Sequence, residues 1–275
     1  MGDDAFATLR DIEPQYDSRG NMIFTSGRES AVFNVNHMGR TYALKCYHNT
    51  RADRAERSAF LRTHDTSGII IHPDYYHGEM WTDKGIVDVA LYPWEEGRTL
   101  DWHIRKALHD NNPRQLQRLL TTFVNLASKL LDEEWRHGDI KTENIIVRPD
   151  GKMILVDCDA LYAPTLPSSG ECGTPNWTHP SRKDNYNRHI DDYGVALMIV
   201  SLAALIANPT LFAGECAVAM PALGNKEHIE QLMAPNSSLT ELHNSLYSET
   251  YIINNIKEQL ECIAHKLQDC TKPLL

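Results

Sequence analysis

The sequence predicts an α+β protein with a small antiparallel β-rich part at residues 1–95 and a mainly helical part at residues 96–275. Short apolar runs, separated by turn residues, recur between residues 21 and 92, which is the pattern of antiparallel strands. Residues 113–136 instead carry apolar side chains at the spacing of one helix face. Residues 195–207 are apolar nearly all round, so they predict a helix in the core of the helical part.

The composition excludes several classes of protein. The 275 residues are 42% hydrophobic and 23% charged, as in ordinary globular proteins, and the net charge of −10 argues against a broad nucleic-acid-binding surface. No apolar stretch is long enough for a membrane segment, and the start of the chain lacks a secretory signal, so we expect a cytoplasmic protein. The six cysteines lack metal-site spacing and are expected to be reduced thiols.

The β-rich part is expected to begin after an N-terminal extension of residues 1–14. Residues 21–47 predict strands joined by a turn at 36–40, and the charged stretch 51–63 predicts a short helix. Three further apolar runs are expected to complete the sheet, at residues 69–71, 75–81 and 86–92.

In the helical part, a hairpin is expected directly after the long helix. Residues 145–147 and 153–156 are apolar runs joined by Pro149-Asp150-Gly151, a turn signal. The polar stretch His137–Asn144 precedes this hairpin and reads H-x-D-x-K-x-x-N, and Asp157 ends its second run, thirteen residues after Asn144.

This polar stretch resembles the catalytic loop of protein kinases, and the chain is similar to the protein-kinase-like superfamily over roughly residues 20–210, as a bacterial-type Ser/Thr protein kinase with the H-G-D variant of the loop. The resemblance implies a bilobal protein-kinase-like fold that binds ATP with Mg²⁺, or Mn²⁺ in its place. It implies that Asp139 orients the attacking hydroxyl and that Lys141 neutralises the transferred phosphoryl group. Asn144 and Asp157 would bind the metal.

Further nucleotide contacts are implied in the β-rich part. Lys45 ends Tyr42-Ala43-Leu44-Lys45, which resembles the V-A-I-K strand whose Lys pairs the α- and β-phosphates, although a solvated Lys is the usual interpretation of such a run. The resemblance requires a Glu on the next helix to pair with this Lys. Glu56 is the first candidate and Asp53 the second, and an ion pair with an Arg of the same helix is the alternative.

The glycine-rich loop and the hinge of the family are only partly matched. Gly27, Ser30 and Val32 fall on the phosphate-covering loop, where a single glycine of the usual three remains. Trp94 lies where kinase backbone groups bind adenine, and Leu91 aligns with the gatekeeper.

Two later segments extend the resemblance. Residues 173–180 are similar to the end of a kinase activation segment, and Asp157-Cys158-Asp159 stands where kinases have D-F-G. Asp191 matches the Asp that ties the backbone of the catalytic loop from the central helix.

Alternatives remain open for the reaction. His137-Gly138-Asp139 also resembles small-molecule phosphotransferases of the aminoglycoside and choline kinase type, whereas Lys141 and residues 173–180 favour a protein substrate over a small molecule. Gly138 stands where many regulated kinases carry an Arg for a phosphorylated loop. A pseudokinase that only binds a nucleotide or a protein is the third interpretation, motivated by the incomplete glycine loop and the uncertain Glu56.

Overall fold

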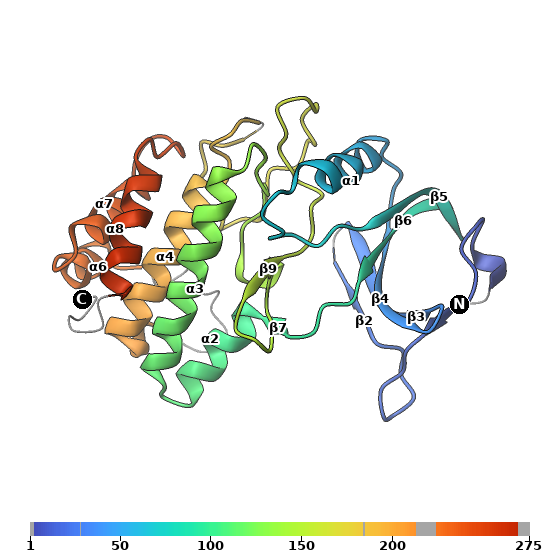
Figure 1. Ribbon diagram of the computed structural model, residues 1–275, viewed down its shortest axis with the longest axis horizontal. Helices are drawn as coiled ribbons and strands as arrows, with labels where there is room; N and C mark the ends of the chain where they lie inside the picture. The colour runs from blue at the N-terminus through green and yellow to red at the C-terminus, as the bar shows by residue number, and fades with distance from the viewer. Residues whose placement is uncertain (1–2, 28, 184, 213–223, 269–275) are drawn as a thin grey trace. The chain divides into compact units, whose positions relative to one another are not determined.

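A computed structural model describes residues 3–27, 29–183, 185–212 and 224–268 as a mixed α+β structure. The chain divides into two compact units (Figure 1). The sheet unit contains the chain up to Asp65 together with Ile71–Glu95, and the helical unit contains Thr66–Ile70 and the chain from Glu96 onward. The predicted α+β class is therefore confirmed.

The sheet unit is built on a six-stranded antiparallel sheet in the order β1-β3-β4-β6-β5, in which β2 also pairs with β3. Met38 (φ 49°) and Gly39 (φ 74°) form the tight turn between β3 and β4, because a two-residue hairpin turn requires positive φ at both positions. The strands are β1 (Ile12–Pro14), β2 (Phe24–Ser26), β3 (Ser30–His37), β4 (Arg40–Tyr47), β5 (Asp74–Thr82) and β6 (Gly85–Pro93).

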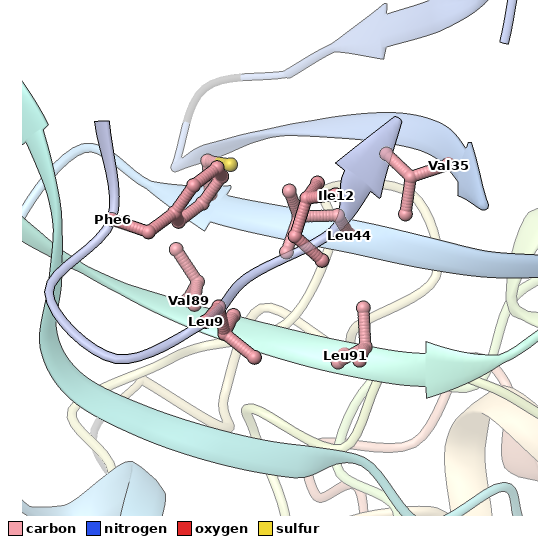
Figure 2. Close-up of a cluster of buried hydrophobic side chains, with 8 residues drawn as sticks. Phe6, Leu9, Ile12, Val35, Leu44, Val89 and Leu91 are labelled. Atoms are coloured by element: carbon pink, nitrogen blue, oxygen red, sulfur yellow. The ribbon is translucent and has the colours of Figure 1, made fainter. Parts of the chain in front are cut away.

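The N-terminal segment is part of the sheet unit and not a separate extension. Phe6, Leu9 and Ile12 are buried in one apolar cluster with side chains from β3, β4 and β6 (Figure 2). The other buried members are Val35, Leu44, Cys46, Val89 and Leu91. The segment begins with a short 3₁₀ helix, η1 (Asp3–Ala5), and covers this face of the sheet.

A buried carboxylate on β5 anchors this segment. Glu79 accepts hydrogen bonds from the amide of Thr8 (2.7 Å), the hydroxyl of Thr8 (2.7 Å) and the amide of Leu9 (2.5 Å). Glu79→Ala should lower the free energy of unfolding by about 3 kcal/mol, since buried donors would lose charge-assisted bonds. Chemical denaturation measures this loss.

The matched control is Asp83→Ala, which removes an exposed carboxylate in the β5–β6 turn. We expect its free energy of unfolding to stay within about 0.5 kcal/mol of the wild type. Equal effects of the two substitutions would show that Glu79 does not anchor the segment.

The apolar run 69–71 does not form a strand of this sheet. Ile70 makes a single parallel bridge with Leu155, and the amide of Leu155 donates to the carbonyl of Ile69 (2.7 Å), so this part of the run belongs to the helical unit. A short continuous apolar run indicates burial and does not by itself distinguish a strand from a buried connection. The predicted charged helix is present as α1 (Asp53–His64).

The helical unit has a buried central helix, α4 (Asp192–Ala207), packed against α3 and α7. A three-stranded antiparallel sheet, β7-β8-β9, contains the predicted hairpin. No helix in the described ranges is both long and apolar enough to cross a membrane. The other helices are α2 (Leu100–His109), α3 (Pro113–Asp132), η2 (Thr142–Asn144), η3 (Pro209–Leu211), α6 (Lys226–Met233), α7 (Ser237–Ser245) and α8 (Ile256–Gln268). The strands are β7 (Arg98–Thr99), β8 (Ile145–Val147) and β9 (Met153–Leu155).

Helix α3 ends four residues earlier than the sequence predicts. The buried guanidinium of Arg136 donates to the carbonyls of Leu130 (3.1 Å), Leu131 (3.1 Å) and Glu133 (2.7 Å), at the end of the helix where backbone carbonyls lose their regular intrahelical bonds. This burial lowers the pKa of Arg136. Helix α3 therefore ends before the polar stretch that begins at His137.

Candidate active site

The polar stretch forms a loop fixed by a buried histidine. His137 is fully buried, and its Nε2 lies 2.9 Å from the carbonyl of Val156, to which it donates. Its Nδ1 accepts a hydrogen bond from the amide of Asp139 (3.3 Å). One donor and one acceptor on the ring correspond to the neutral imidazole. The histidine thus joins the loop to the chain that follows β9.

Asp139 is the centre of a hydrogen-bonded cluster with Lys141, Thr174 and Asn144. Its Oδ2 lies 3.0 Å from Lys141 Nζ and 3.1 Å from both Thr174 Oγ1 and Asn144 Nδ2. Its Oδ1 accepts the amide of Thr174 (2.7 Å), and Lys141 Nζ donates to Thr174 Oγ1 (2.8 Å). The side chains of Asp139 and Lys141 remain 17% and 21% exposed, so a substrate group can reach them.

Thr174 is the member of this cluster that was not among the predicted site residues. The sequence places it in the segment 173–180, and the structure brings its amide and hydroxyl to Asp139. The similarity of that segment to a kinase activation segment was the available signal. A contact across 35 residues leaves no local pattern to reveal it.

Asn144 and Asp157 are brought near each other by the β8–β9 hairpin. The amide of Val156 donates to the carbonyl of Asn144 (3.0 Å), and Asp157 follows directly. Asp157 has a φ of 69°, a left-handed conformation that Asp and Asn adopt more readily than other side chains. Such a conformation is held by its surroundings and is frequent at functional sites.

The side-chain oxygens of Asn144 and Asp157 are of the kind that Mg²⁺ prefers as ligands. The amide nitrogen of Asn144 bonds to both the carbonyl (2.9 Å) and the carboxylate (3.1 Å) of Asp139, which leaves its amide oxygen for a cation. No group of three or more His, Cys, Asp or Glu side chains suited to a metal occurs in the described part of the chain. A small oxygen-ligand set agrees with Mg²⁺, which keeps water and phosphate oxygens as its remaining ligands.

Asp191 holds the loop from the start of α4. The buried carboxylate accepts the amides of His137 (2.6 Å) and Gly138 (2.8 Å), which confirms the expectation that this residue ties the loop backbone. The neighbouring Asp192 is also buried and accepts bonds from His189 Nδ1 (2.8 Å) and the amide of Ile253 (3.1 Å). Burial raises the pKa of Asp192 to about 6.

Within the sheet unit, Lys45 is only 6% exposed, so it does not lie on a solvated face. It lies opposite Val32 on β3 and Ala90 on β6, and its Nζ is 5.2 Å from the centre of the Tyr47 ring. Lysine is rarely buried unless it is paired, so its low exposure distinguishes Lys45 from an ordinary surface lysine.

The predicted phosphate-covering loop is the β2–β3 hairpin. The amide of Gly27 donates to the carbonyl of Ser30 (2.8 Å), which closes the turn and takes up one amide of the predicted cradle. Residue 28 lies outside the described residues. Val32 follows on β3 as the direct neighbour of Lys45, so these two predicted contacts share one face of the sheet.

The predicted gatekeeper, Leu91, faces away from Lys45. It pairs with Leu44 and belongs to the apolar cluster under the N-terminal segment, whereas Lys45 pairs with Ala90. Because directly opposite residues of a pair of strands point to the same face, Ala90 and not Leu91 shares the face of Lys45. Trp94 is 46% exposed, and its amide donates to the carbonyl of Thr41 (3.2 Å).

The structure does not pair Glu56 with Lys45. Glu56 is exposed on α1 and makes no ion pair with any described residue. The alternative, Asp53, pairs with Arg51 (2.7 Å) and with Arg57 of its own helix (3.1 Å), the interaction expected for a carboxylate of a charged helix. Partial burial raises the pKa of Asp53, but the hydrogen bonds and charges of Arg51 and Arg57 together outweigh it and lower the pKa.

Comparison with known proteins adds no relative. No family model matches the chain, and no curated protein matches its sequence. The functional argument therefore depends on the residues and their geometry.

Proposed function

We propose that the chain is an ATP-dependent phosphotransferase of protein-kinase-like fold that transfers the γ-phosphoryl group to a Ser or Thr hydroxyl of a protein. The observation that carries the proposal is the cluster of Asp139, Lys141 and Thr174. In this cluster the hydroxyl of Thr174 lies between the carboxylate of Asp139 and the ammonium group of Lys141. These are the charges that a hydroxyl nucleophile and a transferred phosphoryl group require.

Asp139 would orient the acceptor hydroxyl. Among the described residues, Oδ2 accepts two hydrogen bonds and contacts the ammonium of Lys141, while Oδ1 accepts only the amide of Thr174, so Oδ1 keeps capacity for one more donor. An acceptor hydroxyl that donates to Oδ1 would be oriented for attack, and Asp139 would accept its proton. Lys141 would neutralise charge on the phosphoryl group as it is transferred.

Asn144 and Asp157 would hold Mg²⁺, or Mn²⁺, which supplies positive charge to the phosphate oxygens of bound ATP. Lys45 would bind the α- and β-phosphates, and Val32 on the same face would lie near the nucleotide. Asp191 supports this chemistry indirectly, because it holds the backbone that carries Asp139.

A small-molecule phosphotransferase is the second candidate, favoured by Gly138. A Cβ at this position would lie 2.0 Å from the carbonyl oxygen of Ala160, so the loop has no room for the arginine of regulated protein kinases. A protein acceptor is favoured by residues 173–180, which are similar to a kinase activation segment. The hydrogen bond from Lys141 to Thr174 links the loop to this segment. The unpaired Glu56 is the observation that favours a pseudokinase.

The test is incubation with γ-labelled ATP and Mg²⁺ or Mn²⁺ in the presence of casein, choline or an aminoglycoside. We expect label on Ser or Thr of casein, and none without the divalent cation. Label on choline or the aminoglycoside alone would replace the proposal with the second candidate. Binding of ATP with no transfer to any acceptor would leave a binding protein.

A further inference from the structure

The residue before Asp139 is a glycine, Gly138, which has no side chain to restrict its backbone. Gly138 has a φ of 84°, and a Cβ at this position would lie 2.0 Å from the carbonyl oxygen of Ala160. Glycine is therefore required there, and glycine restricts its own backbone less than any other residue. Contacts from outside the loop therefore contribute to the direction of Asp139, together with those of Asn144 and Lys141 within the loop.

Two charged side chains contact Gly138 from opposite sides. Its amide donates to Asp191 (2.8 Å), and its carbonyl accepts from Arg182 Nη1 (2.7 Å). The carbonyl of Gly138 and the amide of Asp139 share one peptide plane, and that amide donates to His137 over a longer distance of 3.3 Å. The bond from Arg182 is the shorter and charged contact to this plane, and rotation of the plane would turn Asp139.

Arg182 is an unusual residue for this position. It is only 3% exposed, and no carboxylate of the described chain lies within ion-pair distance of it. Its other contact is the carbonyl of Glu171 (3.5 Å), and its Nε has no partner among the described residues. Burying a cation with so few partners lowers the stability of the fold, so we look for a role of Arg182 other than stabilisation.

We propose that Arg182 is a positioning residue that fixes the peptide plane before Asp139 and joins the catalytic loop to the segment containing Glu171 and Thr174. This inference deepens the proposed function and rests on it for its effect on rate. Arg182 and Asp191 together form a loop clamp, in which a guanidinium and a carboxylate hold the two sides of Gly138. A larger residue at position 138 would restrict its own backbone. At Gly138 the hydrogen bonds of the clamp provide this restriction.

The test compares Arg182→Met with Arg182→Lys and a matched control, Arg188→Met. Methionine keeps much of the buried length and removes the donors, and lysine keeps the charge with a single donor group. Arg188 is exposed and makes no hydrogen bond or ion pair in the described part of the chain. The turnover number and the KM for MgATP are measured with casein as acceptor, and hydrogen exchange is followed in residues 137–144 and in α8.

Arg182→Met should lower kcat by about 10²-fold, the typical cost of misplacing a reacting group, with the KM for MgATP changed by less than about twofold. Exchange should rise in residues 137–144 and stay unchanged in α8. Arg182→Lys should give intermediate values for both, and Arg188→Met should match the wild type. If the methionine variant does not fold, the lysine variant decides by the same two measurements.

The inference would be overturned if folded Arg182→Met kept wild-type turnover, or if exchange in residues 137–144 did not change. It would also be overturned if Arg188→Met lost as much activity. A wild-type protein that transfers no phosphate would instead refute the proposed function, and the exchange measurement would still decide whether Arg182 holds the loop.

Discussion

Replacing Asp157 with asparagine should abolish Mg²⁺-dependent phosphoryl transfer while leaving the fold intact. Asparagine tolerates the left-handed conformation of this position (φ 69°), so the backbone after β9 should keep its course. The substitution removes the negative charge offered to the cation, which is worth several kcal/mol in the transition state and corresponds to about a 10³-fold loss of rate. Turnover with casein at saturating Mg²⁺ and the melting temperature are the two measurements.

Asp150→Asn is the matched control for this experiment. Asp150 is exposed in the turn of the same hairpin, and among the described residues it pairs only with the exposed Lys152. Its substitution should change neither rate nor melting temperature measurably. An Asp157→Asn protein that turns over normally would refute the metal assignment, and one that does not fold would make Asp157 a structural residue.

The secondary structure of both units could largely be predicted from sequence, because its signals are local. The turn at Met38-Gly39, the hairpin after Asn144 and the apolar stripe of α3 all depend on residues within a few positions of each other. The burial of Phe6, Leu9 and Ile12 could not be predicted in this way, since it depends on a sheet face made by later strands. This short segment has too few apolar residues for their spacing to indicate a strand or a helix.

In the candidate site, too, local positions could be predicted from the sequence and contacts between distant segments could not. The positions of Asp139, Lys141 and Asn144 follow from a single loop, so their spacing was sufficient to select them. Thr174 and Arg182 reach this loop from 35 and 44 residues away along the chain, and only the folded structure reveals their contacts. The sequence left open whether Glu56 pairs with Lys45 or with an arginine of its own helix, and among the described residues it makes neither pair. The ion pair within the helix is made by Asp53 and Arg57.

Lys141→Ala should lower kcat by about 10²-fold or more, with ATP affinity little changed. Lys141 Nζ lies 3.0 Å from Asp139 Oδ2 and 2.8 Å from Thr174 Oγ1, so its charge is held beside the group that would orient the acceptor. A positive charge at this place stabilises the negative charge that is redistributed during transfer, and it contributes less to ground-state binding. Lys45→Ala should instead weaken ATP binding and turnover together, because its proposed contacts are ground-state phosphates.

Two further variants separate the charge of Lys141 from its bonds. Thr174→Val removes the bridging hydroxyl but leaves the contact between Lys141 and Asp139, so it should cost less than Lys141→Ala. Lys152→Ala removes an exposed ammonium on the β8–β9 turn and should leave kcat unchanged. If Thr174→Val lost as much rate as Lys141→Ala, the lysine would act by organising the segment and not through its charge. If Lys141→Ala kept the wild-type rate on casein, the protein-kinase proposal would lose its main support and a small-molecule acceptor would be favoured.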